Sequence, residues 1–489
     1  MLRATRLVSP LRVIQKRQIS LLIQKNPGSI TLQDIENSSI VKNDDNDISD
    51  ERLKLIHDIN HSENQLKFEL NKYLIPDFSY YFKLPRESVN LDVLQRLIEI
   101  NPGRVYSSVE LFNKYQREIG QPSQEIISAL VSKLLHGEIY EIRDLENGEV
   151  FIPSAENLKK LVELMSKFEF ESQTLNSILD KISVHPELVS VIYHLVDQKL
   201  ISVEHLTNYI NQEPELNNNT YVEILNIIFQ NAPETLNIKQ VVDILELTRE
   251  SEDSPIPSTK ESPQLDFEYE KLDKNHLRQQ VFDYIEEHKL DMAETALLLR
   301  VVLVETYGIY ENKLQHATDL FHKYQSHAKF GIGMVQYQLF KSYCYHAISD
   351  DKQIYLKIGE TLVNPQEMNV RTIQLLMLTQ SHFDSEIALK YYNDYISQVS
   401  KEINSTNKRS SAGYLTETLV LASLYDNDRN FATLVLEKAV QNDIVTGEYE
   451  ISQIKRLFKL YGESFKESDD WELAKPLFKQ HVLDYIKRL

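Results

Sequence analysis

Apolar residues recur at helical spacing along most of the chain, and the pattern is clearest after residue 275. Residues 291–294 have the spacing of a capping box with Asp291 as the cap, and the apolar run ALLLRVVLVETY follows until Gly308 can stop the helix. A second segment carries an apolar stripe at intervals of three or four residues, formed by Leu314, Ala317, Phe321 and Tyr324. These two segments predict one antiparallel pair of helices.

Further helix pairs follow the first at a similar interval. They begin near Met334, Asn369, Gly413 and Glu450, and polar turns divide them at 349–352, 382–385, 425–430 and 462–470. The starts lie about 35 to 44 residues apart, and two helices in a repeat of that length are typical of an α-solenoid. The sequence therefore predicts an all-α protein in which residues 275–489 form a solenoid of antiparallel helix pairs.

In several second helices, a small residue is followed four positions later by a large one. The pairs are Ala317 and Phe321, Ala388 and Tyr392, Ala432 and Leu436, and Ala474 and Phe478. A small side chain lets the paired helix approach closely, and the large one fills the space toward the next pair. We expect these residues to pack between repeats, in a pattern that resembles the second helix of tetratricopeptide repeats.

Residues 51–249 predict an N-terminal helical domain with one β-hairpin near 138–153. Apolar residues flank an Asn147-Gly148 pair there, which suits a type I′ turn. Helices followed by a hairpin also occur in winged-helix readers of nucleic acid, but Arg143 is the one base among five acids in this segment. We therefore expect a packed structural hairpin. Serine and proline are frequent in residues 250–274, and this composition predicts a linker after the N-terminal domain.

The first 25 residues hold six basic side chains and no acid. Helical spacing places their apolar residues on one face, formed by Ala4, Leu7, Val8, Leu11 and Ile14. This composition is typical of a mitochondrial targeting peptide, which we expect to cover residues 1–19 and to be cleaved near Ser20. Residues 20–50 are polar and acidic, which predicts a disordered segment.

The predicted subcellular location is the mitochondrial matrix or the matrix side of the inner membrane. The chain has no run of about 20 apolar residues, so we expect no transmembrane helix. An association with the inner membrane would therefore be peripheral.

The net charge of −20 is unevenly distributed. Residues 276–489 carry 24 basic and 29 acidic side chains, so residues 26–275 hold a net charge of −21. That acidic half repels phosphate backbones, and we expect it to contact a basic protein partner and no DNA. RNA or another partner would instead meet a basic patch near the C-terminus, formed by Lys455, Arg456, Lys459, Lys475, Lys479 and Lys487. A solvated helix face is the other interpretation of these charges.

The sequence shows no catalytic constellation, so we expect a protein that is not an enzyme and that binds no cofactor or metal. Gly331 and Gly333 lack the third glycine and the preceding strand of a dinucleotide site. Cys344 lies among aromatic residues, as a buried thiol would. Three histidines come close together in the sequence, but their spacing does not place metal ligands on one helix face: His316, His322 and His327.

Aromatic residues at helical spacing support two interpretations. They could stack on RNA bases along a groove, or they could form the core of the helix pairs, which is the interpretation we favour. The residues are Tyr337, Phe340, Tyr343, Tyr345, Tyr391, Tyr392 and Tyr395.

The targeting peptide and the helix pairs together resemble the divergent helical-repeat factors, similar to tetratricopeptide and pentatricopeptide proteins, of fungal mitochondria. The resemblance implies a role in organellar gene expression, meaning mRNA maturation, stability or translation. It also implies binding to mitochondrial mRNA or to the ribosome. The alternative is a matrix scaffold between proteins, such as an assembly factor for a respiratory complex.

Overall fold

The computed structural model describes most of the chain from residue 121 onward. The described ranges are 121–136, 139–145, 148–153, 155–185, 188–212, 214–249, 272–327, 331–364, 368–465 and 470–489, with single positions at Ile98, Val109, Phe112, Asn113 and Gln116. The predicted targeting peptide (1–19) and acidic segment (20–50) lie outside these residues, as does most of the predicted linker (250–274). The chain divides into two compact units, and the described residues 237–249 belong with the second.

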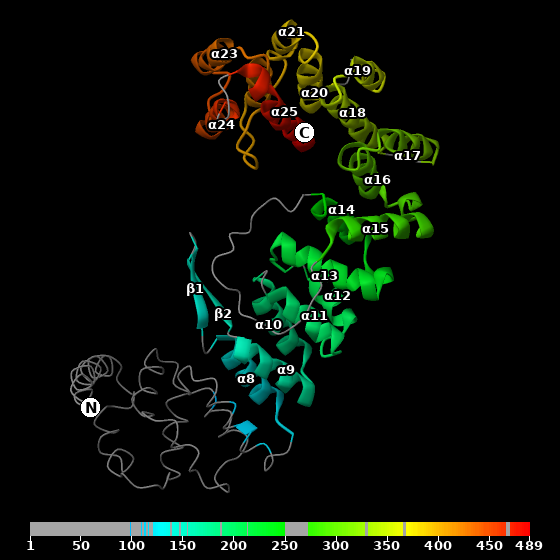
Figure 1. Cartoon of the computed structure of the whole chain (residues 1–489), viewed down its shortest axis with the longest axis vertical. Helices are drawn as coiled ribbons and strands as arrows, with labels where there is room; N and C mark the ends of the chain where they lie inside the picture. Colours follow the sequence, from blue (N-terminus) through cyan, green and yellow to red (C-terminus); the bar gives the residue numbers. More distant parts are fainter. Residues whose placement is uncertain are drawn as a thin grey trace, which may run out of the picture. The chain divides into compact units, whose positions relative to one another are not determined.

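The described part of the first unit consists of helices and one pair of strands (Figure 1). Its helices are α8 (Gln124–His136), α9 (Ala155–Lys167), α10 (Ser172–Ser183), α11 (Val189–Asp197), α12 (Val203–Asn211), α13 (Asn218–Asn231) and the 3₁₀ turn η4 (Pro233–Thr235). Strands β1 (Ile139–Leu145) and β2 (Gly148–Pro153) pair antiparallel, with Leu145 opposite Gly148. Helix α8 contacts α9, α10 and β2.

The second unit begins with α14 (Ile238–Leu247), which a capping box starts. The side chain of Asn237 accepts a hydrogen bond from the backbone N–H of Gln240, and the side chain of Gln240 accepts one from the backbone N–H of Asn237. The predicted boundary at residue 249 therefore falls within a compact unit, because α14 packs on a helix that follows the predicted linker.

The remaining helices of the second unit extend to the end of the chain. They are α15 (Lys274–His288), η5 (Leu290–Met292), α16 (Leu297–Glu305), η6 (Thr306–Tyr310), α17 (Leu314–His327), α18 (Ile332–Ser349), α19 (Gln353–Glu360), α20 (Val370–Ser381), α21 (Glu386–Tyr395), α22 (Ser411–Tyr425), α23 (Arg429–Gln441), α24 (Glu448–Ser464) and α25 (Trp471–Arg488). The prediction of a helical protein is confirmed for the described residues. The solenoid arrangement stays a prediction.

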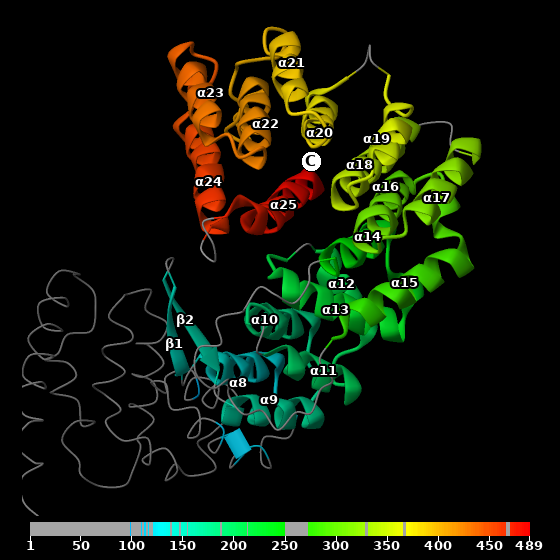
Figure 2. The ribbon, with the colours of Figure 1, turned by 45° about the horizontal axis from the view of Figure 1, so that its top comes forward.

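The helices of this unit pack in a regular order. The even-numbered helices α14, α16, α18, α20, α22 and α24 each contact the next in that series. Helices α17, α19, α21 and α23 each lie against the even-numbered helix next to them in the chain. Helix α25 departs from this order, because it contacts α18 and α22 as well as α24. Figure 2 shows α25, in red, running from α24 back toward α18.

The capping box predicted at residues 291–294 is wrong. Residues Leu290–Met292 form the 3₁₀ turn η5, and α16 begins only at Leu297. The Asp291 carboxylate is buried and accepts from Lys323 Nζ at 2.6 Å and from Tyr324 Oη at 2.9 Å. Gly308 does not end the helix either, since it lies inside the π-helical turn η6. The contacts of this buried carboxylate with Tyr324 and with the exposed Lys323 have overridden the local capping signal.

Within the described residues, none of the helices combines the length and the apolar composition that crossing a membrane requires.

Cys344 is fully buried in α18. Burial raises the pKa of its thiol to about 12, so little thiolate exists at neutral pH in the folded chain. We expect iodoacetamide at pH 8 to alkylate the native protein far more slowly than the protein in urea. Mass spectrometry of the modified peptide over time measures both rates, and equal rates would contradict the buried position.

Candidate functional site

The residues predicted to pack between repeats lie in the interior of the second unit. Ala317, Ala388, Ala432 and Ala474 are buried, and so are Phe321, Tyr392 and Phe478. Leu436 is half-buried and packs against the same core. These positions therefore shape the helix packing and offer no binding surface, with the exception of Ala388, which lies at the floor of a groove.

The aromatic residues considered as a stacking surface belong to the core. Phe340, Tyr343 and Tyr392 are buried. The other four are half-buried and pack against the hydrophobic cluster that contains Phe340 and Tyr392: Tyr337, Tyr345, Tyr391 and Tyr395. All seven aromatic residues therefore belong to the packed interior of the helix pairs, as the second of the two interpretations predicts.

A buried polar network holds the last helix, α25, against α20 and α22. Tyr485 Oη accepts from Gln374 Nε2 at 2.8 Å and donates to Glu417 Oε2 at 3.0 Å. Burial raises the pKa of Tyr485 well above its ordinary value, so the phenol is protonated at physiological pH. Arg409 compensates the buried Glu417 carboxylate at 2.7 Å. Tyr485 is therefore a neutral donor and acceptor at the centre of this seam.

A second buried network connects the residues just after α14 with α16, α18 and α25. Glu305 forms ion pairs with Arg249 (Nη1 to Oε2, 2.9 Å) and with Lys341 (Nζ to Oε1, 2.7 Å). Lys341 also donates to the backbone carbonyl of Lys487 at 2.6 Å. Burial lowers the pKa of Lys341, while the Glu305 carboxylate opposes that shift. One carboxylate thus compensates two cations in the interior.

The predicted basic patch separates into two groups in the structure. The three lysines of α25 are half-buried. Lys479 donates to Ser349 O and to Asp351 Oδ2, each at 3.1 Å. Lys475 lies over the ring of Tyr425, and Lys487 lies 3.4 Å from Asp484. These cations hold α25 in place, so they do not form one open surface.

The three basic residues of α24 are exposed. Lys455, Arg456 and Lys459 occupy the outer face of the helix, and Tyr449 lies one turn and a half before them with 47% of its surface exposed. Lys459 has Glu463 at 4.0 Å as a partner. This face is the part of the predicted patch that can still meet an anionic partner.

His382 joins α20 to α25 through a shared carboxylate. Its Nε2 lies 2.6 Å from Asp351 Oδ1, and Lys479 of α25 binds the other oxygen of Asp351. The His382 ring stacks on Tyr425. The positive charge of Lys475 lies close enough to disfavour protonation of that ring. Burial lowers the pKa of His382, so the ring is neutral near pH 7.

We expect acid to destabilise the second unit through His382, because the buried ring must take up a proton. Because the folded-state pKa of His382 is depressed, its contribution to stability is complete above the unfolded pKa of about 6.5 and is lost as the pH falls toward the folded value. The His382→Gln variant should therefore lose less thermal stability between pH 7.5 and pH 5.5 than the unsubstituted chain. Thermal unfolding followed by the fluorescence of Trp471 measures this, and equal losses would contradict the assignment.

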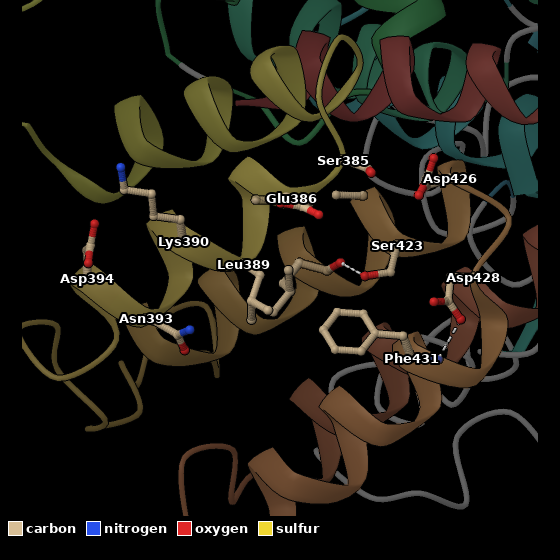
Figure 3. Close-up of a pocket in the computed structure, with 13 residues that line it drawn as sticks. Ser385, Glu386, Leu389, Lys390, Asn393, Asp394, Ser423, Asp426, Asp428 and Phe431 are labelled. Atoms are coloured by element: carbon tan, nitrogen blue, oxygen red, sulfur yellow. Dashed lines mark hydrogen bonds between the residues drawn. The ribbon is translucent and has the colours of Figure 1, made fainter.

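A groove lies between α21 and α23, above α22 (Figure 3). It has a volume of about 620 Å³. Its floor is formed by small and aliphatic side chains, Ala388, Leu419 and Ala422. Leu389 and Phe431 line it further, and 38% of the Leu389 side chain is exposed. Figure 3 shows these two side chains near the middle of the groove.

The rim of the groove is acidic. Four carboxylates line it, Glu386, Asp394, Asp426 and Asp428, against one cation, Lys390. Asp428 caps α23 by accepting from Phe431 N at 2.9 Å. Within the described residues, none of the four forms an ion pair closer than 4.0 Å. The groove therefore presents unneutralised negative charge around an apolar floor.

Sequence reasoning did not find this groove. Its acids come from segments 32 to 42 residues apart, and each segment alone is an ordinary helix end or exposed helix face. Within the described residues, His316, His322 and His327 do not belong to a group of three or more potential metal ligands.

The chain is similar to a known domain family in its C-terminal part and to a yeast protein over most of its length. Residues 393–489 match the family described as MRX12 C-terminal domain. The chain is also 21% identical over 401 residues to MIOREX complex component 12 of Saccharomyces cerevisiae, an alignment that covers 77% of this chain and 76% of the relative. The family match includes α22 to α25, and therefore Tyr485, the exposed face of α24 and one side of the groove, whereas Gln374 of α20 lies before it.

Proposed function

We propose that this protein acts in mitochondrial gene expression as a component that binds other proteins through its second unit. Similarity to a MIOREX complex component over three quarters of both chains supports a mitochondrial location and a role in gene expression. The basic N-terminal residues also support a mitochondrial location. The function is proposed to be non-catalytic.

The acidic groove is the observation that favours protein over RNA as the partner of this unit. RNA affinity comes largely from neutralising phosphates with lysine and arginine. The lysines of α25 instead bind within the unit, as Lys479 does with Asp351. The unit thus offers a concave surface with the wrong charge for RNA and the right charge for a basic protein.

Cells that lack this protein test the proposed role. We expect pulse labelling of mitochondrial translation products to show loss of one or more products, with cytosolic translation unchanged. Northern analysis of mitochondrial transcripts then separates a defect in mRNA from a defect in translation. Normal labelling together with normal transcripts would overturn the proposal.

Direct RNA contact is a second candidate, carried by the exposed face of α24. Lys455, Arg456 and Lys459 could contact phosphates, and Tyr449 could stack on a base. Changing the three cations to glutamine should abolish RNA crosslinking by ultraviolet light in intact mitochondria if this candidate is correct. Crosslinking that persists in the variant would exclude this face.

A further inference from the structure

We propose that the groove between α21 and α23 binds a basic segment of a partner protein, with one aliphatic side chain inserted between Leu389 and Phe431. This inference rests on the proposed function as far as the partner belongs to the mitochondrial gene-expression machinery. The binding chemistry itself follows from the residues of the groove. It also moves the expected basic partner, which the sequence alone assigned to the acidic N-terminal half, to the second unit.

The floor of the groove fits an aliphatic anchor. Ala388 and Ala422 leave space because neither has a side chain beyond Cβ, and Leu389 keeps 38% of its side chain exposed. Exposing a leucine in a concave site costs free energy that an inserted apolar side chain recovers. A volume of about 620 Å³ accommodates a few side chains, which suits a short segment better than a folded domain.

The rim explains why the segment should be basic. Glu386 and Asp394 are eight residues apart on α21, which separates them by about 12 Å along the helix axis. Asp426 and Asp428 lie at the turn between α22 and α23, on the other side of the apolar floor from Asp394 (Figure 3). Cations on both sides of an aliphatic residue would therefore each meet a carboxylate.

Lys390, the one cation among the residues that line the groove, allows a test of whether the bound segment is positively or negatively charged. Lys390 lies between Glu386 and Asp394 on α21. Its side chain is exposed, so its removal should not affect folding. If the occupant is basic, Lys390→Ala should strengthen binding about two- to threefold, whereas an acidic occupant or RNA would bind more weakly.

The experiment measures fluorescence anisotropy of labelled probes with the purified full chain. The first probe is a 12-residue peptide in which leucine alternates with arginine and lysine. The second has glutamate in place of every cation, and the third is a 12-nucleotide single-stranded RNA. We expect the basic peptide alone to bind, with an affinity that falls as salt rises.

Two variants with equal changes in charge localise the binding. The groove variant carries E386Q, D394N, D426N and D428N, and asparagine at 428 preserves the cap of α23. The control carries E286Q, E287Q, E294Q and E402Q, all at exposed positions outside the groove. We expect the groove variant to bind the basic peptide at least about tenfold more weakly, and the control to bind it as the unsubstituted chain does.

Leu389→Asn tests the apolar anchor separately and should weaken binding of the basic peptide about fivefold. Equal losses in the groove variant and the control would show general charge attraction and overturn the proposal. Absence of peptide binding, or RNA binding that depends on the groove residues, would overturn it as well. The role in mitochondrial gene expression would still stand in each case if translation fails in cells without the protein, so the two failures are distinguishable.

Discussion

Replacing Glu305 with glutamine should lower the free energy of unfolding of the second unit by about 3–5 kcal/mol. Glu305 is the carboxylate that compensates both Arg249 and Lys341 in the interior. The amide has the same shape but no charge, so Lys341 would lose its carboxylate partner and Arg249 would keep only the more distant Glu246. Urea unfolding followed by Trp471 fluorescence measures the change, because Trp471 is the one tryptophan of the chain and begins α25.

Lys341→Met is the matched control for this change. It leaves the Arg249–Glu305 pair intact and removes only one cation and the donor to Lys487 O, so we expect a smaller loss of about 1–3 kcal/mol. The double variant should be more stable than the sum of the two single losses predicts, because the contacting side chains are coupled. An E305Q protein within about 1 kcal/mol of the unsubstituted chain would contradict a buried ion-pair network here.

Tyr485→Ala should cost about 3–5 kcal/mol in the same measurement. The side chain is buried between α20, α22 and α25, and its removal leaves a cavity and takes one hydrogen-bond partner each from Gln374 and Glu417. We expect amide hydrogen exchange to speed up throughout α25, because Tyr485 carries the central contact of that helix with the rest of the unit.

Tyr485→Phe separates the packing from the hydrogen bonds. It keeps the ring and removes only the hydroxyl, so the loss should be about 1–3 kcal/mol. Since Glu417 keeps its ion pair with Arg409, the carboxylate remains compensated. If the phenylalanine and alanine variants unfold at the same urea concentration, the ring does not pack as described.

Local pattern predicted the helices of the second unit well. Met334, Asn369, Gly413 and Glu450 all lie at or near the start of an observed helix, because apolar stripes and N-caps are local signals. Asn369, for example, caps α20 by accepting from Thr372 N. The failure at Asp291 shows the limit of such signals, since its buried carboxylate bonds to Lys323 and Tyr324 and does not cap a helix.

The candidate site could be predicted only in part. The basic residues near the C-terminus were found from composition, but their separation into α24 and α25 depends on contacts far apart in the chain. Lys479 meets Asp351, and no local pattern joins residues so distant. The acidic groove was missed for the same reason, because its floor and rim come from three helices.

Affinity purification of the tagged full chain from mitochondria, with and without ribonuclease, tests the central claim most directly. The partners are quantified by mass spectrometry against an untagged preparation. Binding through protein contacts predicts that proteins of mitochondrial gene expression stay enriched after the RNA is digested, and that the groove variant loses them while the charge-matched control keeps them. Enrichment that disappears with the RNA would contradict the account.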